Sequence, residues 1–270
     1  MRKIGFIGCG KMASAIIKGI IKTNYINPEN VIASKSSPDN LENVSKNLGI
    51  KITLDNKEVA KFGDIIFLAV KPNQIEGVLR EIKDFITPEK LIVSVAAGVK
   101  ISFIEALLPE GAKVVRVMPN TPVLVNEGMA GIGVNSRIST KDLEEVQAIF
   151  NSIGKSVVVD ESQIDIVTAI SGSGPAFFYK VINDIARAGE KLGLDYEKAL
   201  LLSIQTALGS AKMALNREIS MEELISNVAT KGGCTRVGVD VMEGVNGEVK
   251  TDELFYEVIK STADKARDLG

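Results

Sequence analysis

The chain has 270 residues, of which 45% are hydrophobic, and its 32 basic and 34 acidic side chains leave a net charge of −2. There is no basic excess for nucleic acid, no apolar run of the roughly 18 residues that span a membrane, and no signal peptide before the first predicted strand. The sequence contains no histidine, and Cys9 and Cys234 lie far apart. These features exclude histidine catalysis, a histidine metal site and a disulfide framework, so we expect a soluble, cytoplasmic protein without a metal.

The first predicted element is a buried strand at residues 4–7, followed by Gly8-Cys9-Gly10-Lys11-Met12-Ala13 and an amphipathic helix. A strand, a glycine turn and a helix N-terminus together bind the pyrophosphate of a dinucleotide. Gly8 permits the sharp turn, Gly10 lets the backbone approach the phosphates, and Ala13 lets the helix pack closely on the strand. The motif therefore predicts a dinucleotide cofactor.

The second predicted strand, at residues 31–33, ends in Ser34-Lys35-Ser36. At this position an acidic residue binds the 2′-hydroxyl of NAD(H), whereas hydroxyls and a cation accommodate the 2′-phosphate of NADP(H). The segment has two hydroxyls, a lysine and no acid, which favours NADPH. NADH stays open as the alternative, because the rule is a tendency.

Strands predicted at 50–53, 64–70, 91–95 and 114–118 alternate with helices and are almost uniformly apolar. This pattern is typical of an α/β fold with a doubly wound, Rossmann-like, mostly parallel sheet that has helices on both faces. Three of the strands end in the turns Lys71-Pro72, Ala96-Ala97-Gly98 and Pro119-Asn120-Thr121-Pro122. Ligands of such sheets lie at the carboxyl ends of the strands, so we expect the nicotinamide at this rim.

The pattern changes after a strand predicted at 130–134, a helix at 140–152 and a strand at 156–159. From about residue 163 it indicates only helices, at 164–170, 175–192, 196–215, 221–228, 236–243 and 252–268. We predict a dinucleotide-binding domain at 1–160 and a helical domain at 161–270. Helices such as the one that contains Ala199-Leu200-Leu201-Leu202 are apolar on more than one side, so we expect the helical domain to dimerise.

Two turns are predicted between these helices, Ser171-Gly172-Ser173-Gly174-Pro175-Ala176 and Thr230-Lys231-Gly232-Gly233-Cys234-Thr235. Each precedes a helix whose first N–H groups could hold a carboxylate. In the motif at 171–176, Ser173 or Gly174 could cap the following helix, and Pro175 suits the first helical turn. Together they suggest a small carboxylate substrate, although each could be an ordinary helix start without a ligand.

With Gly8-x-Gly10-x-Met12-Ala13 and Ala69-Val70-Lys71-Pro72, these two motifs make the chain resemble pyrroline-5-carboxylate reductase, the last enzyme of proline synthesis, over essentially its whole length. The resemblance implies NAD(P)H-dependent reduction of a cyclic imine to L-proline, with the active site completed by the partner subunit of a homodimer or larger homo-oligomer. The cofactor-binding residues that follow from it and from the rim turns are Gly8, Gly10, Lys11, Met12, Ala13, Ser34, Lys35, Ser36, Asn56, Ala69, Val70, Lys71, Pro72, Ala97 and Gly98.

The same resemblance implies substrate contacts at Glu218, Thr230, Gly233, Cys234 and Thr235, with Thr235 as the proton donor. The two helix starts add Gly232, Ser173 and Gly174. We hypothesise that hydride reaches C5 of a protonated 1-pyrroline-5-carboxylate while Thr235, or a water that it orients, contacts the ring nitrogen. An iminium is already electrophilic, so the reaction needs no histidine.

The chain departs from the usual family pattern at Lys11, Lys231 and Cys234, and three alternatives stay open. A β-hydroxyacid dehydrogenase would use a lysine after its glycine turn, and Lys180 and Asn183 stand in such positions, although Pro175-Ala176 disturbs the match. A paralogous reductase would act on 1-pyrroline-2-carboxylate or a six-membered ring. The third alternative is a catalytically silent NADP(H)-binding sensor or assembly protein.

Overall fold

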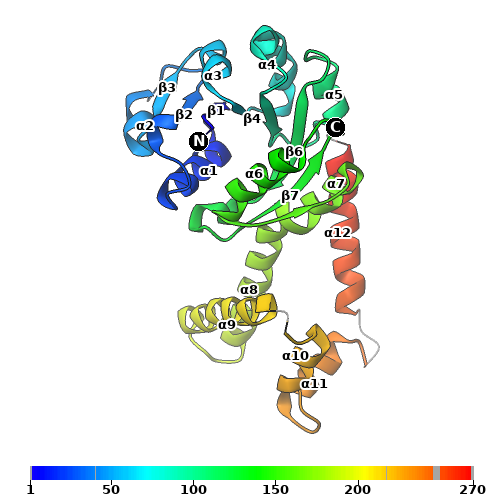
Figure 1. The fold of residues 1–270 in the computed structure, drawn as a ribbon. Helices are drawn as coiled ribbons and strands as arrows, with labels where there is room; N and C mark the ends of the chain where they lie inside the picture. Colours follow the sequence, from blue (N-terminus) through cyan, green and yellow to red (C-terminus); the bar gives the residue numbers. More distant parts are fainter. Residues whose placement is uncertain (1, 40, 217, 246–249, 269–270) are drawn as a thin grey trace. The chain divides into compact units, whose positions relative to one another are not determined.

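The computed structural model describes residues 2–39, 41–216, 218–245 and 250–268 (Figure 1). The chain forms two compact units, one of Met1–Ser173 with Thr262–Gly270 and one of Gly174–Ser261. The predicted domain division after residue 160 stays a prediction.

The first unit contains an eight-stranded sheet in the order β3-β2-β1-β4-β5-β6-β7-β8. Only β7 runs antiparallel to its neighbour β6, and the other neighbouring strands pair in parallel. The predicted doubly wound, mostly parallel sheet is therefore confirmed. The strands are β1 (Ile4–Ile7), β2 (Val31–Ser34), β3 (Lys51–Thr53), β4 (Ile65–Leu68), β5 (Leu91–Ser94), β6 (Lys113–Pro119), β7 (Gly128–Val134) and β8 (Gly154–Val158).

The strand order reverses at β1, which lies between β2 and β4. Ile7, the last residue of β1, lies opposite Ser34 at the end of β2 and Leu68 at the end of β4. The loops that follow these three strands therefore leave the sheet side by side. This topological switch point is where doubly wound folds bind their ligands.

Helices cover both faces of the sheet because alternate residues of its strands point to opposite sides. Phe6 belongs to the apolar cluster that includes α1 and α6, and its ring stacks on Phe67 at 4.5 Å between centroids. The neighbouring Ile7 belongs to the cluster on the other face, which includes α3, α4 and α5. The helices of the first unit are α1 (Lys11–Lys22), α2 (Leu41–Leu48), α3 (Asn56–Phe62), α4 (Ile75–Ile82), α5 (Ile101–Glu105), α6 (Thr140–Asn151) and α7 (Ile164–Val167).

Helix α7 packs directly on β7, although the sequence pattern assigns it to the helical half. A Cβ atom on Gly131 of β7 would stand 2.5 Å from the Val167 side chain, so only a glycine allows this approach. Arg116 of β6 is buried and its guanidinium lies 3.3 Å from the Asp165 carboxylate. These contacts explain why the first compact unit extends through α7.

The second unit is helical, as predicted. The close packing of α8 on α9 depends on small residues: Ala186 and Ala199 are buried, and a Cβ on Gly189 would stand 3.3 Å from Ala199. Within the described parts of the chain, no helix combines the length and apolarity that crossing a membrane requires. The helices of the second unit are α8 (Gly174–Lys191), α9 (Tyr196–Asn216), α10 (Met221–Val228), α11 (Cys234–Met242) and most of α12 (Thr251–Arg267).

The prediction of a turn at Ser171-Gly172-Ser173-Gly174-Pro175-Ala176 is wrong, because this segment is helical. A π-helical stretch, Thr168–Gly172, continues from α7, Ser173 has helical dihedral angles, and α8 begins at Gly174. The Ser173 N–H donates to the Thr168 carbonyl at 2.8 Å. Ser173 is therefore not an extended cap residue, and its N–H is already used.

Pro175 and Asn120 explain how the helix continues through this segment. Pro175 has no N–H to donate to the Ser171 carbonyl one turn earlier. The side-chain amide of Asn120 donates to that carbonyl instead, at 3.1 Å, and accepts from the Met129 N–H at 2.8 Å. The buried Asn120 thus satisfies the carbonyl that the proline leaves without a helical partner.

Asp142 at the start of α6 holds three segments of the first unit together. Its buried carboxylate accepts from the Arg2 guanidinium at 3.0 Å, the Lys113 ammonium at 2.9 Å and the Ser139 hydroxyl at 2.6 Å. Burial acts to raise the pKa of Asp142, but hydrogen bonds from Ser139, Lys113 and Arg2 outweigh it and hold this pKa well below the ordinary value. The ionised form is therefore the one that stabilises the fold.

We predict that Asp142→Asn lowers the free energy of unfolding by about 2–3 kcal/mol at pH 7, because it leaves two cations without their shared carboxylate. In the unchanged protein, this stabilisation is complete above the ordinary aspartate pKa of about 3.9 and is lost as the pH falls through the lower pKa of the folded state. Urea unfolding at pH 7 measures the effect of the substitution on the free energy of unfolding, and urea unfolding below pH 4 measures the loss of this stabilisation in acid. Glu144→Gln, at an exposed site of the same helix, is the control, and an equal effect of both variants would contradict the prediction.

Candidate active site

A cleft of about 410 Å³ opens at the switch point of the first unit, where the loops after β1, β2, β3 and β4 meet. None of the described residues that line it is acidic, and Lys35 and Lys71 carry positive charge at its wall. Such a cleft suits an anionic ligand. Its lining residues are Gly8, Cys9, Gly10, Ser34, Lys35, Ser36, Leu54, Asn56, Ala69, Val70, Lys71, Gln74 and Val78.

The glycine loop of this cleft fits a pyrophosphate. Gly8 has φ +93°, in the left-handed region, and a Cβ there would stand 2.7 Å from the Ala69 carbonyl oxygen. Gly10 caps α1, and a Cβ there would meet nothing within 4 Å, so the loop leaves open the space that a side chain would take. The N-terminus of α1, which begins at the exposed Lys11 and has no acid in its first turn, faces an anion favourably.

Met12 and Ala13 do not line the cleft. Ala13 is 1% exposed and Met12 packs on the same apolar cluster beneath the sheet. Their side chains pack α1 against the sheet and so fix the position of the glycine loop, without contacting the cleft themselves.

A chain of hydrogen bonds connects the glycine loop to helix α4. The Gly8 N–H donates to the Ser34 hydroxyl oxygen at 3.3 Å, and the Ser34 hydroxyl donates to Asn56 Oδ1 at 2.6 Å. Asn56 Nδ2 then donates to the Glu81 carboxylate at 2.7 Å. Ser34 is only 1% exposed. Its hydroxyl is therefore engaged within the protein, although the sequence suggested it as a direct contact of a 2′-phosphate.

The two neighbours of Ser34 are placed differently. Lys35 donates from Nζ to the Asp39 carbonyl oxygen at 2.8 Å and lines the cleft, and Ser36 is exposed at its edge. These two side chains are the ones in this segment that remain available to a phosphate group. They provide one cation and one hydroxyl, as phosphate recognition requires.

Cys9 lies in the same loop but is not placed for nucleophilic chemistry. Its sulfur is 3.7 Å from the Ser14 hydroxyl oxygen. Burial raises the pKa of the Cys9 thiol, against the lowering effects of Ser14 and the Lys35 charge. The uncharged thiol is a poor nucleophile, so Cys9 acts as a small side chain in the turn.

A second hollow of about 660 Å³ lies in the same unit, beside the loops that follow β4 and β5. It contains the predicted rim residues Pro72 and Gly98, and Gly98 has φ +76°. Ala97 precedes Gly98 in the same loop and is half-buried. The full lining is Pro72, Asn73, Gly98, Val99, Lys100, Ser102 and Phe103.

The second predicted turn is present in the helical unit. Gly232 has φ +79°, and the Gly233 N–H donates to the Thr230 carbonyl oxygen at 3.0 Å, which closes a tight turn. Gly233 caps α11, which begins at Cys234, two residues earlier than the sequence predicted. The half-buried Thr235 is the second residue of the helix, and its first turn has no acid. This arrangement suits a carboxylate.

The remaining substrate candidates lie around this turn or at other helix ends. Cys234 and Thr230 are exposed, and Glu218 is an exposed residue of the connection between α9 and α10. Gly174 is buried at the start of α8, next to the half-buried Ser173. The cofactor candidates all belong to the first unit, whereas Gly174 and the residues from Glu218 to Thr235 belong to the second.

Four residues of the cofactor cleft region lie outside the motifs that the sequence singled out: Leu54, Gln74, Val78 and Glu81. Leu54 directly follows β3, so its position at a strand end was a usable signal. The other three lie on α4 or just before it. Their role depends on how closely α4 approaches the glycine loop, which no local pattern contains.

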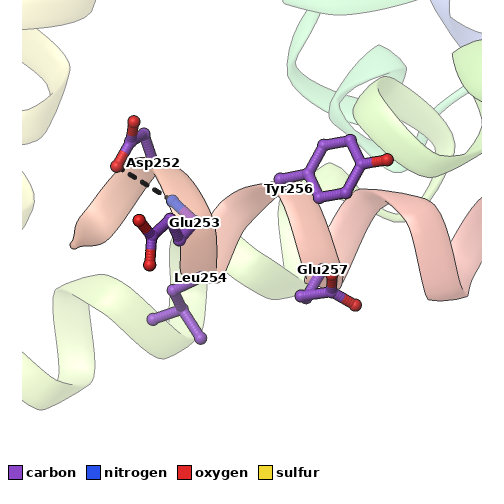
Figure 2. A pocket seen from close by; sticks show the side chains of 5 residues that line it. All are labelled: Asp252, Glu253, Leu254, Tyr256 and Glu257. Atoms are coloured by element: carbon purple, nitrogen blue, oxygen red, sulfur yellow. Dashed lines mark hydrogen bonds between the residues drawn. The ribbon is translucent and has the colours of Figure 1, made fainter. Parts of the chain in front are cut away.

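Another hollow, of about 770 Å³, lies on α12 and is lined by Asp252, Glu253, Leu254, Tyr256 and Glu257. Figure 2 shows that these side chains all project from this one helix, with the Asp252 carboxylate accepting from the Glu253 N–H at 3.0 Å. None of the predicted site residues lines it, and its three carboxylates would repel an anionic cofactor. The smaller cleft at the switch point is therefore the better cofactor site.

The fold and the cleft define a dinucleotide-dependent oxidoreductase with a helical second unit. A family described as NADP oxidoreductase, coenzyme F420-dependent, matches residues 3–98, and the pyrroline-5-carboxylate reductase dimerisation family matches residues 161–269. The pyrroline-5-carboxylate reductase of Methanosarcina acetivorans is 40% identical over 100% of this chain and 98% of its own length. The chain belongs to the pyrroline-5-carboxylate reductase family.

Solved structures agree with this assignment. A pyrroline-5-carboxylate reductase from Coxiella burnetii has a TM-score of 0.93 and 36% identity, over 100% of this chain and 98% of that one. The pyrroline carboxylate reductase of Plasmodium falciparum, solved with NADP bound, has a TM-score of 0.86 and 34% identity over the same shares. The protein is an NAD(P)H-dependent oxidoreductase.

Proposed function

We propose that the protein reduces 1-pyrroline-5-carboxylate to L-proline with NADPH as the preferred reductant. The observation that carries the proposal is the full-length similarity to pyrroline-5-carboxylate reductases, whose match spans both the cofactor cleft and the Thr230–Thr235 turn. The cleft without acids and the paired cation and hydroxyl at Lys35 and Ser36 support NADPH over NADH.

In this proposal, the first unit binds and orients the cofactor, which supplies the hydride when bound. The N–H groups at the start of α1 hold the pyrophosphate, and Lys35, Ser36 and Asn56 contact the adenosine ribose and its 2′-phosphate. The loops after β4 and β5 hold the nicotinamide end. The predicted residues of these loops are Ala69, Val70, Lys71, Pro72, Ala97 and Gly98.

The second unit binds the imino acid. The N-terminus of α11 holds the carboxylate with the N–H groups of its first turn, and the Thr235 hydroxyl oxygen, or a water that it orients, accepts a hydrogen bond from the N–H of the protonated ring nitrogen. Glu218, Thr230 and Cys234 complete the contacts, with Ser173 and Gly174 at the start of α8. Most of the rate then comes from the positioning of the hydride donor and acceptor.

We further propose a homodimer in which the helical domain, residues 161–270, completes the active site of the partner subunit. The helical unit exposes many large apolar side chains, and exposed apolar patches mark protein–protein interfaces. Phe178 is 67% exposed, and Leu201 and Leu202 are 68% and 60% exposed. Burial of these side chains against a second copy would remove them from water. The cytoplasmic location stays a prediction.

The β-hydroxyacid dehydrogenase alternative loses support from the contacts of its candidate residues. Lys180, which would be its catalytic lysine, is 72% exposed in its side chain and pairs with Asp184 one turn later at 2.7 Å. Asn183 accepts from the Tyr196 hydroxyl at 3.0 Å and so fastens α8 to α9. Both side chains serve the helical unit itself.

Initial rates of cofactor oxidation test the reaction. With 1-pyrroline-5-carboxylate we expect fast oxidation of NADPH and slower oxidation of NADH, because Lys35 and Ser36 recognise a phosphate. Slower turnover of 1-pyrroline-2-carboxylate and 1-piperideine-6-carboxylate should distinguish this activity from that of a paralogous reductase. If no imine oxidises either cofactor although NADPH binds, the protein is the silent cofactor-binding protein instead.

We predict that Thr235→Ala lowers kcat by about 10²-fold to 10³-fold, as loss of a positioned hydrogen-bonding group beside the reacting atoms does, with a near-native unfolding temperature. The half-buried hydroxyl has no structural hydrogen bond among the described contacts, so the fold should tolerate its loss. Thr235→Ser keeps the hydroxyl and should recover most of the rate. Unchanged kinetics in the alanine variant would remove Thr235 from the mechanism.

The dimer proposal predicts that Leu201→Glu produces a monomer with little activity, because a charge cannot be buried in an apolar interface without a partner. Leu124→Glu makes the same substitution at a leucine of similar exposure, 64%, in the first unit. It should leave the assembly unchanged. Sedimentation velocity measures the oligomeric state of both variants and of the protein without substitutions. If the protein without substitutions sediments as a monomer, the dimer proposal is wrong.

A further inference from the structure

The hydrogen-bond chain beside the cofactor cleft has two ends with fixed chemical roles. At one end, the Gly8 backbone N–H can only donate, and at the other, the Glu81 carboxylate can only accept. The Ser34 hydroxyl and the Asn56 amide lie between them and can each donate or accept. The ends therefore decide which way the bonds of the two middle groups point.

Glu81 is the end that fixes the Asn56 amide. Because the carboxylate accepts only, it requires Nδ2 of Asn56 to face it, at 2.7 Å, and Oδ1 then accepts from Ser34 at 2.6 Å. Gly8 alone would not enforce this, since the Ser34 oxygen has two lone pairs and could accept from both Gly8 and an inverted Asn56 amide. Removal of the carboxylate would make both orientations possible.

The orientation determines what the cleft presents to the adenosine ribose. Asn56 lines the cleft, and its Nδ2 group has a second hydrogen besides the one that Glu81 accepts. The Ser34 hydroxyl, in contrast, gives its one hydrogen to Asn56 and retains only acceptor capacity. A phosphate oxygen needs donors, whereas a ribose hydroxyl can use either role.

We propose that Glu81 is a positioning residue for cofactor selectivity: by accepting from Asn56 Nδ2, it makes Asn56 a hydrogen-bond donor toward the 2′-phosphate of NADPH. Ser34 then contributes by holding Asn56 and Gly8, while Lys35 and Ser36 contact the phosphate directly. The proposal rests on the NAD(P)H site and on no property of the imine substrate.

The orientation of Asn56 by Glu81 favours NADPH binding, whereas the negative charge of Glu81 disfavours it. A carboxylate near a phosphate repels it, so removal of the charge alone would tighten NADPH binding. Loss of the enforced amide orientation would weaken it. The sign of the change in NADPH affinity therefore separates a positioning role from a purely electrostatic one.

The test is isothermal titration of the full-length protein with NADPH and with NADH. Glu81→Gln keeps the shape, but its amide can donate as well as accept, so we expect the Kd for NADPH to rise about threefold to tenfold. The Kd for NADH should change by less than about twofold, because a ribose hydroxyl can donate to an inverted Asn56. Unchanged or tighter NADPH binding overturns the proposal.

Glu76→Gln is the matched control. Glu76 lies on the same helix α4 and loses the same charge, but its carboxylate accepts from Arg80 at 2.8 Å and does not contact Asn56. Both dissociation constants should stay unchanged. An equal rise of the NADPH Kd in this variant would assign the effect to a general disturbance of α4 and overturn the positioning role.

A double-mutant cycle tests the route of the effect. In an Asn56→Ala background, Glu81→Gln should no longer raise the NADPH Kd, because there is no amide to orient. A persistent effect would overturn the proposal. Glu81→Ala replaces Glu81→Gln if thermal unfolding shows that the glutamine variant is unfolded. Because binding is measured without an imine, these results do not depend on which substrate the enzyme reduces.

Discussion

The close approach of Gly8 to the end of β4 is the constraint on which the cofactor site depends. A Cβ atom at this residue would stand 2.7 Å from the Ala69 carbonyl oxygen, and the backbone has φ +93°. Only glycine satisfies both conditions. The turn brings the N-terminus of α1 beside the strand ends at the point where the strand order reverses, which is where doubly wound folds bind their ligands.

The helical unit has the opposite character, since its packing leaves much of its apolar surface exposed. Small residues such as Ala199 and Gly189 bring α8 and α9 close together, while Phe178 and Leu201 remain exposed. An independent monomer would keep this surface in water at a cost in free energy. Residues 161–269 match the pyrroline-5-carboxylate reductase dimerisation family. The exposed apolar side chains give a physical reason for self-association in such a family, because association removes them from water.

Side-chain amides form hydrogen bonds at positions where the backbone alone does not supply a partner. Asn120 satisfies the Ser171 carbonyl, to which Pro175 cannot donate, and so permits a helix where the sequence indicates a turn. Asn56 performs a comparable task in the cleft, where it connects Ser34 to Glu81. In both cases a side-chain amide supplies a donor and an acceptor at once.

The sequence by itself determined the sheet and most of the helices, and it predicted the cofactor rim, because these follow from local signals: apolar runs, glycine spacing and the residues at strand ends. It could not determine how the non-local contacts use those residues. Ser34 was expected to meet a phosphate, but α3 and α4 bring Asn56 and Glu81 to it, and its hydroxyl is committed there. Likewise, the glycines and proline at 171–176 signal a turn locally, whereas Asn120, which directly follows β6, donates to the Ser171 carbonyl within a continuous helix. Tertiary structure decided these points because hydrogen-bond partners distant in sequence leave no periodic pattern.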